Sequence, residues 1–194
     1  MGLRHLDGLF YRIVPAARAD HALAPAVSPE GRFHHSGRPT LYVSPRPDWA
    51  AHAIATYVRD TDPPRVICEL RLTAKVLDLS DPAHCTAAHI DPTLAAIPWL
   101  PQRAQGLPAS SWTVSDRARA FGADGMIYTA RSELSRWHLV LFRWPGARLT
   151  GRSWPTRSNL LVRLRLLVGT IPARSDKVDD ERPRSAEIQT LRNS

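Results

Sequence analysis

The chain has 194 residues, a formal net charge of +8, 43% hydrophobic residues and six tryptophans. This apolar content excludes a wholly disordered chain, and the length suits one domain with an appendage, since domains cluster around roughly 100 to 150 residues. No apolar run approaches the roughly 20 residues that cross a bilayer, and the first residues lack a signal peptide's apolar stretch. We therefore expect a cytoplasmic protein without a membrane segment.

The cysteines and the net charge limit the possible sites and binding partners only in part. Cys68 and Cys85 are too few for a disulfide framework and too far apart for a CxxC site, so we expect buried thiols. The charge comes almost entirely from arginine, because Lys75 and Lys177 are the only lysines. Such a balance suits nucleic acid, an acidic protein or a phosphate-bearing small molecule. A GC-rich genome also produces excess arginine without function, so charge alone selects none of them.

The first part of the chain predicts two strands, a loop and a helix. LFYRIV (9–14) is typical of a strand, and the Pro- and Gly-punctuated residues 25–39 predict an irregular loop. LYVS (41–44) predicts a short strand. The Ala-rich residues 48–59 predict a helix, with Asp48 as its N-cap.

The middle of the chain predicts more strand than helix. RVICELRL (65–72) alternates, which indicates a strand with one wetter face. Residues 76–79 predict a further extended piece that runs into a turn at 80–82. A short helix is expected over 91–97, where the following proline ends it.

The last predicted elements of the core are one helix and two strands. SWTVSDRARAF (111–121) predicts a helix stopped by Gly122, as a C-terminal glycine commonly does. Residues 125–128 and 138–143 predict the final strands. We therefore expect a core domain over residues 1–147.

Beyond this core the composition changes. Residues 148–194 are rich in Arg, Ser, Thr and charged side chains, and we expect a basic C-terminal extension that is partly disordered or loosely packed. An apolar island at 160–171 could pack as a strand or helix, bind a partner, or lie outside the ancestral domain. The sequence leaves these three alternatives open.

The order of the elements indicates the fold class. Strands interspersed with short helices, without a regular βαβ rhythm, predict an α+β fold and argue against a doubly wound parallel sheet. The sequence contains no GxGxxG, P-loop, HExxH or zinc-ligand spacing. Common nucleotide and metal motifs therefore do not identify its site, and we expect no metal.

Four stretches in the same order resemble the RES domain family. They are the Tyr-Arg of FYRIV, GRFHHSGRPTLY (31–42), LPASSWTVSDRARAFGADG (107–125) and MIYTARSELSRWHLVLF (126–142). No single stretch is specific, but the ordered set is. The resemblance implies a mixed-sheet core like that of ADP-ribosyltransferases. It also implies a bacterial toxin that degrades NAD and is neutralised by an antitoxin.

The resemblance also assigns site residues. Arg32 matches the arginine for which the family is named, and Thr129 occupies the position of its serine. Its glutamate would fall at about Ala53, so this acid is replaced. NAD recognition is expected from Arg12, Arg32, Tyr42, Thr129 and Arg131. Catalytic roles are expected for Arg32, Tyr42, Thr129 and His52.

Each of these residues could also have a purely structural role. An arginine in a strand can pair with an acid or reach solvent, Tyr42 can fill the core, and Thr129 can line a strand end. A histidine can act as acid or base near neutral pH, so His52 or His34 is a candidate to take over a catalytic role, although either could simply be solvated.

Two glutamates are candidates to replace the missing acid from other elements. Glu69 lies on a predicted strand, where an exposed or paired side chain is the ordinary reading, and Glu133 follows the Thr-Ala-Arg segment. Asp124 in GADG is expected to make a turn instead.

Three functions therefore compete. The first is a toxin that consumes NAD by hydrolysis, phosphorolysis or ADP-ribosyl transfer, and the second is a module that binds NAD or a partner without turnover. Nucleic-acid binding ranks last, because only net charge supports it. The sequence leaves open whether the chain forms a homodimer.

Overall fold

The computed structural model describes residues 2–59 and 61–156, in which a six-stranded mixed sheet is combined with short helices. The strands are β1 (Arg4–Pro15), β2 (Leu41–Val43), β3 (Arg65–Asp78), β4 (Gly125–Thr129), β5 (Trp137–Leu141) and β6 (Arg148–Pro155). The α-helices are α1 (Pro47–Ile54), α2 (Pro82–Ala87), α3 (Thr93–Ala96), α4 (Trp99–Ala104) and α5 (Ser110–Ala120). Two short 3-10 helices, η1 (Ala16–His21) and η2 (Ala55–Tyr57), complete the set. The predicted α+β class is confirmed.

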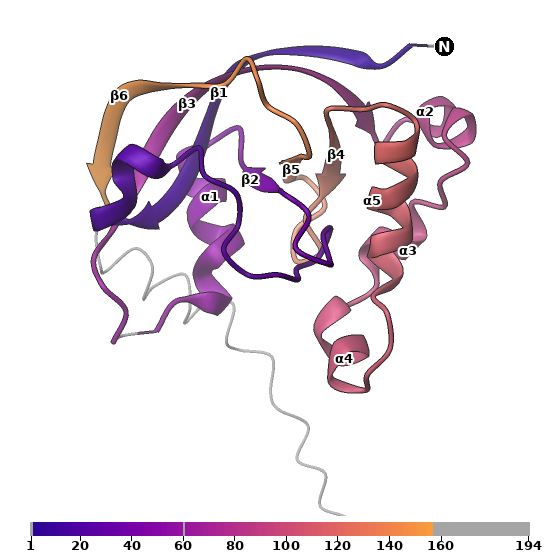
Figure 1. Ribbon diagram of the computed structural model, residues 1–194, viewed down its shortest axis with the longest axis horizontal. Helices are drawn as coiled ribbons and strands as arrows, with labels where there is room; N and C mark the ends of the chain where they lie inside the picture. The colour runs from indigo at the N-terminus through magenta and orange to yellow at the C-terminus, as the bar shows by residue number, and fades with distance from the viewer. Residues whose placement is uncertain (1, 60, 157–194) are drawn as a thin grey trace, which may run out of the picture.

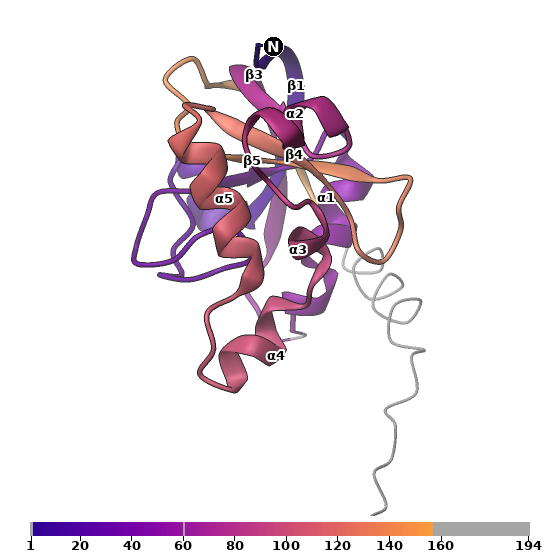
Figure 2. The same ribbon diagram turned by 90° about the vertical axis from the view of Figure 1, so that its right-hand side faces the viewer.

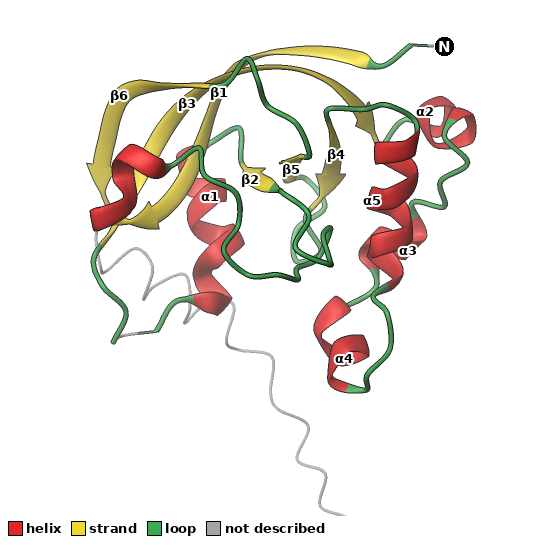
Figure 3. Ribbon diagram, viewed as in Figure 1, coloured by secondary structure: helices red, strands yellow, loops and turns green. Residues whose placement is uncertain are grey.

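The long strand β3 organises the sheet, whose strand order is β1-β3-β4-β5-β2 (Figure 3). β1 pairs antiparallel with β3 along its whole length. On the other edge, β6 pairs antiparallel with residues 66–71, and β4 pairs parallel with residues 76–78. β5 is antiparallel to both β4 and β2. The carboxyl ends of β3 and β4 therefore lie side by side.

The two ends of this strand path meet. Tyr11 in β1 and Ser44, just after β2, form an antiparallel bridge with N···O distances of 2.7 and 2.9 Å. The sheet thus curls on itself, and its concave side encloses apolar side chains such as Phe10, Leu41 and Leu70.

The helices gather at two ends of the sheet (Figures 1 and 2). α1 packs on β1 and β3, where Ala50 and Ala51 are buried in one apolar cluster with Ile13 and Ile67. α2 to α5 lie together at the other end, near β4. The small residues of α1 allow the close approach of helix and sheet.

The second group of helices covers one face of β4 and β5. Val114 and Ala118 of α5 are buried with Phe33, Met126 and Val140 in one apolar cluster. α5 ends before Gly122, whose φ of +88° matches the predicted C-terminal glycine. This packing places the loop that carries Phe33 against both α5 and the sheet.

Several predicted boundaries are wrong. The pieces expected at 65–72 and 76–79 are one strand. Its expected wetter face is only partly so, because Arg65 and Arg71 are half-buried, whereas Ile67 packs under α1 and Glu69 is only 5% exposed. α1 begins at Pro47 and ends at Ile54, and Asp48 pairs with Arg46 in its first turn instead of capping it.

Other elements were not predicted at all. Neither α2 nor α4 is predicted from the sequence, and α3 is shorter than the helix expected over 91–97. β6 lies beyond the boundary expected at residue 147 and extends the sheet by pairing with β3. The apolar island at 160–171 and most of the expected extension lie outside the described residues.

Candidate active site

A tight turn fixes the position of Arg32. The Gly31 N–H donates to the His34 carbonyl at 2.9 Å, and the indole N–H of Trp112 donates to the Gly31 carbonyl at 2.8 Å. The Ser111 hydroxyl donates to the carbonyl of Arg32 itself. Two of the stretches that carry the family resemblance, GRFHH and the start of α5, are thus joined by hydrogen bonds.

The Arg32 guanidinium is held in a defined orientation. Nη2 and Nε donate to the Ala95 carbonyl at 2.7 and 3.3 Å, and Cζ lies 4.9 Å from the ring centroids of both Phe33 and Tyr128. Burial lowers the pKa of Arg32 and the nearby Tyr128 opposes that shift, but a guanidinium remains cationic at neutral pH. The contacts through Nε and Nη2 leave Nη1 available to a ligand.

Arg32 lines a cavity of about 250 Å³. Tyr128, Thr129 and Arg131, at the end of β4, share this wall with Arg32, and the surrounding side chains are aliphatic. Burial raises the pKa of Tyr128 to about 12, so its hydroxyl stays protonated. The cavity lies at the carboxyl end of a parallel strand pair, where α/β sheets commonly bind ligands.

The structure thus brings together Arg32, Thr129 and Arg131 of the predicted site residues. Tyr128 was not predicted, although its place directly before Thr129 in GMIYT was a usable signal, because the last residues of a strand that ends at a site tend to reach it. Leu134, which is 79% exposed, stands at the margin of the same cavity.

Tyr42 lies behind the turn and does not line the cavity. Its hydroxyl accepts a hydrogen bond from the Phe33 N–H at 3.0 Å and lies 2.9 Å from Nδ1 of His34. Nε2 of His34 lies 2.9 Å from the Ser28 carbonyl, which can only accept, so Nε2 carries the proton and Nδ1 accepts from Tyr42. Burial raises the pKa of Tyr42. Both nitrogens of His34 are therefore engaged in holding the loop.

Arg12 also faces the protein interior. Its Nη1 donates to the carbonyls of Ala22 and Ala24 at 2.7 and 2.5 Å, and burial lowers the pKa of Arg12 to about 10. The side chain ties β1 to the segment after η1, and it is not part of the cavity wall. This contact accounts for the arginine inside a strand.

Two further histidines, His138 and His52, have lowered pKa values. His138 of β5 is buried, with Nδ1 2.8 Å from the Ser44 hydroxyl and its ring centroid 5.6 Å from that of Tyr128. Burial, with help from Arg32, lowers the pKa of His138 to about 4, so its imidazole is neutral. His52 of α1 is half-buried, and burial followed by the charge of Arg136 lowers its pKa. Neither histidine is part of the cavity wall.

Residues 8–158 match the RES domain family. The chain belongs to this family. The predicted resemblance is confirmed. Among solved structures, this RES domain is similar to the crystal structure of the M. tuberculosis MbcT–MbcA toxin–antitoxin complex, with a TM-score of 0.53 and 19% sequence identity. The match covers 85% of this chain and 92% of that chain, and at this identity it shows a shared fold. No curated protein matches the sequence.

The three carboxylates considered from the sequence, Glu69, Glu133 and Asp124, lie outside the cavity wall. Glu69 is buried in β3, where it accepts a hydrogen bond from the Tyr11 hydroxyl at 3.2 Å. Glu133 is exposed and accepts from the N–H and hydroxyl of Ser135, which lowers the pKa of Glu133. Asp124 accepts from the Lys75 N–H at 2.9 Å, so it joins the segment before β4 to β3. In the described ranges, the cavity wall contains no Asp or Glu.

Two further searches concern the described residues alone. None of their helices is long and apolar enough to span a membrane. No group of three or more His, Cys, Asp or Glu side chains among them could hold a metal ion. Cys68 and Cys85 are both buried free thiols, as predicted.

Proposed function

We propose that this RES domain is the toxin of a toxin–antitoxin module and that it binds and degrades NAD. The observation that carries the proposal is the cavity of about 250 Å³ in which the Arg32 guanidinium, the Tyr128 ring and Thr129 meet. Membership of the family and the likeness to a toxin–antitoxin complex support the same function.

The cavity suits the recognition of a pyridine dinucleotide. The Nη1 group of Arg32 is held in place to donate to a phosphate oxygen, and Arg131 adds a second cation to the same wall. Tyr128 adds an aromatic side chain to the wall beside Arg32, and the Thr129 hydroxyl can bond a carboxamide. The residues present therefore fit the pyrophosphate and the nicotinamide half of NAD.

The reaction we propose is cleavage of the bond between the ribose carbon and the nicotinamide nitrogen. Nicotinamide leaves with the bonding electrons as a neutral ring, and water, phosphate or an acceptor group forms the new bond to the ribose. These acceptors correspond to glycohydrolysis, phosphorolysis and ADP-ribosyl transfer. The cation, the ring and the hydroxyl hold the substrate through this step.

Positive charge develops on the ribose during this cleavage, and glycoside-cleaving enzymes commonly use carboxylates around such a state. Ala53 stands at about the position where the family glutamate is expected. We retain His52 as a candidate base for the proton of an attacking water, because it directly precedes Ala53 in the chain, although it does not line the cavity; its lowered pKa keeps the imidazole neutral. Unchanged turnover by His52→Ala would exclude this role.

One observation favours a second function. Within residues 2–59 and 61–156, no carboxylate lines the cavity, so the domain would bind NAD without turning it over and act through a partner. This alternative predicts NAD binding with no loss of NAD.

Release of nicotinamide separates the two functions. The full chain is incubated with NAD, with and without phosphate, and the products are resolved by chromatography beside Arg32→Ala. Release that disappears in Arg32→Ala supports the toxin, and dependence on phosphate identifies phosphorolysis. Binding of NAD without any release supports the module instead.

We further propose a cytoplasmic location and an acidic antitoxin as the partner. The net charge of +8 favours an acidic surface, and the related solved structure is a toxin–antitoxin complex. Nucleic acid ranks behind a protein partner, and a strongly salt-dependent affinity for generic DNA would reverse that order. Sedimentation of the free chain distinguishes a monomer from a homodimer.

A further inference from the structure

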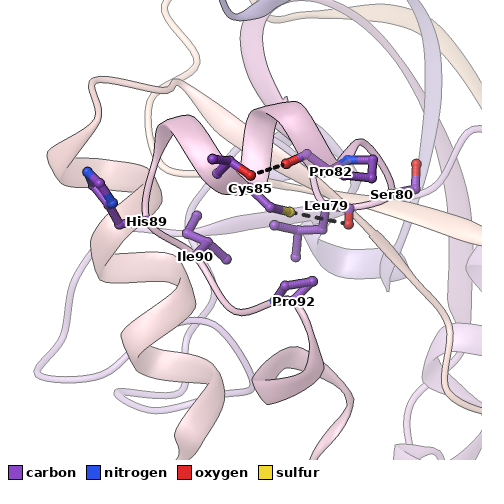
Figure 4. Close-up of a pocket in the computed structure, with 8 residues that line it drawn as sticks. Leu79, Ser80, Pro82, Cys85, His89, Ile90 and Pro92 are labelled. Carbon is purple, nitrogen blue, oxygen red and sulfur yellow. Dashed lines mark hydrogen bonds between the residues drawn. The ribbon is translucent and has the colours of Figure 1, made fainter.

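A second cavity adjoins the one that contains Arg32. Its volume is about 580 Å³, and Figure 4 shows Leu79, Ile90 and Pro92 converging beneath α2, with Ser80 and His89 at its sides. Leu79 and Pro92 line both cavities. Both cavities therefore meet at Leu79, the residue that follows β3, beside the end of β4.

The two volumes indicate a ligand that extends across both. Small-molecule sites span about 300–1,000 Å³, so the cavity of about 250 Å³ is small for a whole dinucleotide, whereas the second lies within the range. A dinucleotide has two ring-bearing halves joined by an anionic link. A pair of adjoining cavities matches that division.

The charges are divided in the same way. The first cavity has the guanidinium groups of Arg32 and Arg131, whereas the described wall of the second has no Lys, Arg, Asp or Glu. Aliphatic side chains of Leu79, Ile90 and Pro92 form much of that wall. Such surfaces suit an uncharged flat ring more than a phosphate.

The two hydroxyl groups at the second cavity act as hydrogen-bond acceptors toward a ligand. The Thr86 hydroxyl donates to the Pro82 carbonyl at 2.8 Å, and the Ser80 hydroxyl donates to Asp78 at 2.6 Å. Their protons are engaged, so both oxygens offer lone pairs to a ligand. The exocyclic amino group of adenine is a donor of the kind that these oxygens accept.

We propose that the second cavity is the adenosine subsite of the same dinucleotide, with the pyrophosphate at Arg32 and the nicotinamide half in the first cavity. This inference rests on the proposed function. It assigns α2 and the segment from Ile90 to Pro92 to substrate recognition, and it predicts that removing the adenosine half of the ligand removes every interaction with them.

Thr86→Trp tests the subsite, because Thr86 is exposed on α2 and an indole there would fill the cavity without replacing a core residue. Thr113→Trp is the matched control, since Thr113 is also an exposed helical threonine but lines neither cavity. Calorimetric titrations of the full chain with NAD, AMP and nicotinamide mononucleotide measure binding directly. Unchanged thermal unfolding of each variant confirms that it folds, and Thr86→Phe replaces Thr86→Trp if it does not.

We expect Thr86→Trp to weaken NAD and AMP binding by more than about tenfold and to leave nicotinamide mononucleotide unaffected, while Thr113→Trp changes none of them. Wild-type affinity of Thr86→Trp for NAD and AMP would overturn the subsite and leave the proposed function standing. If neither NAD nor nicotinamide mononucleotide binds the wild-type chain, the proposed function fails and the subsite falls with it.

Discussion

Replacing Gly31 by alanine perturbs the turn that carries Arg32. A Cβ at Gly31 would overlap the His34 ring, with Nδ1 2.8 Å away, and would lie 3.4 Å from the Tyr42 hydroxyl oxygen. The ring is not free to move, because both of its nitrogens are hydrogen-bonded. Overpacking of this kind costs about 1–3 kcal/mol, and the turn must open to relieve it.

The matched control is Gly8→Ala, because a Cβ there would meet only Phe10 Cε2, at an ordinary 3.6 Å. In a chain of this size each kcal/mol lowers Tm by about 2–4 °C, which circular dichroism resolves. We expect Gly31→Ala to unfold at a lower temperature and to bind NAD more weakly, and Gly8→Ala to do neither. A Gly31→Ala protein with wild-type Tm and NAD affinity would refute the role of the turn.

Three further substitutions test other contacts. The pKa of His138 falls from 6.5 to about 4 on folding, so between these pH values the unfolded chain binds a proton that the folded chain does not. The free energy of unfolding is therefore unaffected by His138 above pH 6.5 and decreases, by at most about 3 kcal/mol, as the pH falls toward 4. His138→Gln should therefore flatten the decline in urea stability across that interval, and an unchanged decline would contradict the buried neutral imidazole. Tyr42→Phe leaves the Phe33 N–H without its acceptor and should lower urea stability by about 1–3 kcal/mol, whereas wild-type stability would argue against this anchor. Arg12→Met should destabilise the fold but keep NAD affinity, and loss of affinity in a folded Arg12→Met protein would place Arg12 in the ligand site.

The sequence predicts those elements that show an alternation of apolar and polar residues or that end at a residue typical of a helix end. α5 was found because Gly122 follows it, and residues 65–72 were found from their alternation. The strand continues through Ala74 and Lys75, which alternate between buried and exposed but are poor strand formers, so its middle was missed. α2 and α4 are too short to show a helical period, and such helices depend on packing against the rest of the fold.

The site was predictable where a residue type and its motif coincide. Arg32, Thr129 and Arg131 were named from the family resemblance, and they share one cavity wall. The surroundings of Arg12 and Tyr42 were not predictable, because their partners are backbone groups that only the folded chain brings within reach. His138 looked like an ordinary strand residue, since nothing local to HLVLF indicates burial beside Ser44.

The most direct test of the account is a calorimetric titration of NAD into the full chain and into Arg32→Ala. The account predicts saturable binding by the wild type and a loss of more than about tenfold in affinity for Arg32→Ala, with its thermal unfolding little changed. Equal affinity of the two proteins, or no binding by the folded wild type, would contradict the claim that the Arg32 cavity recognises NAD.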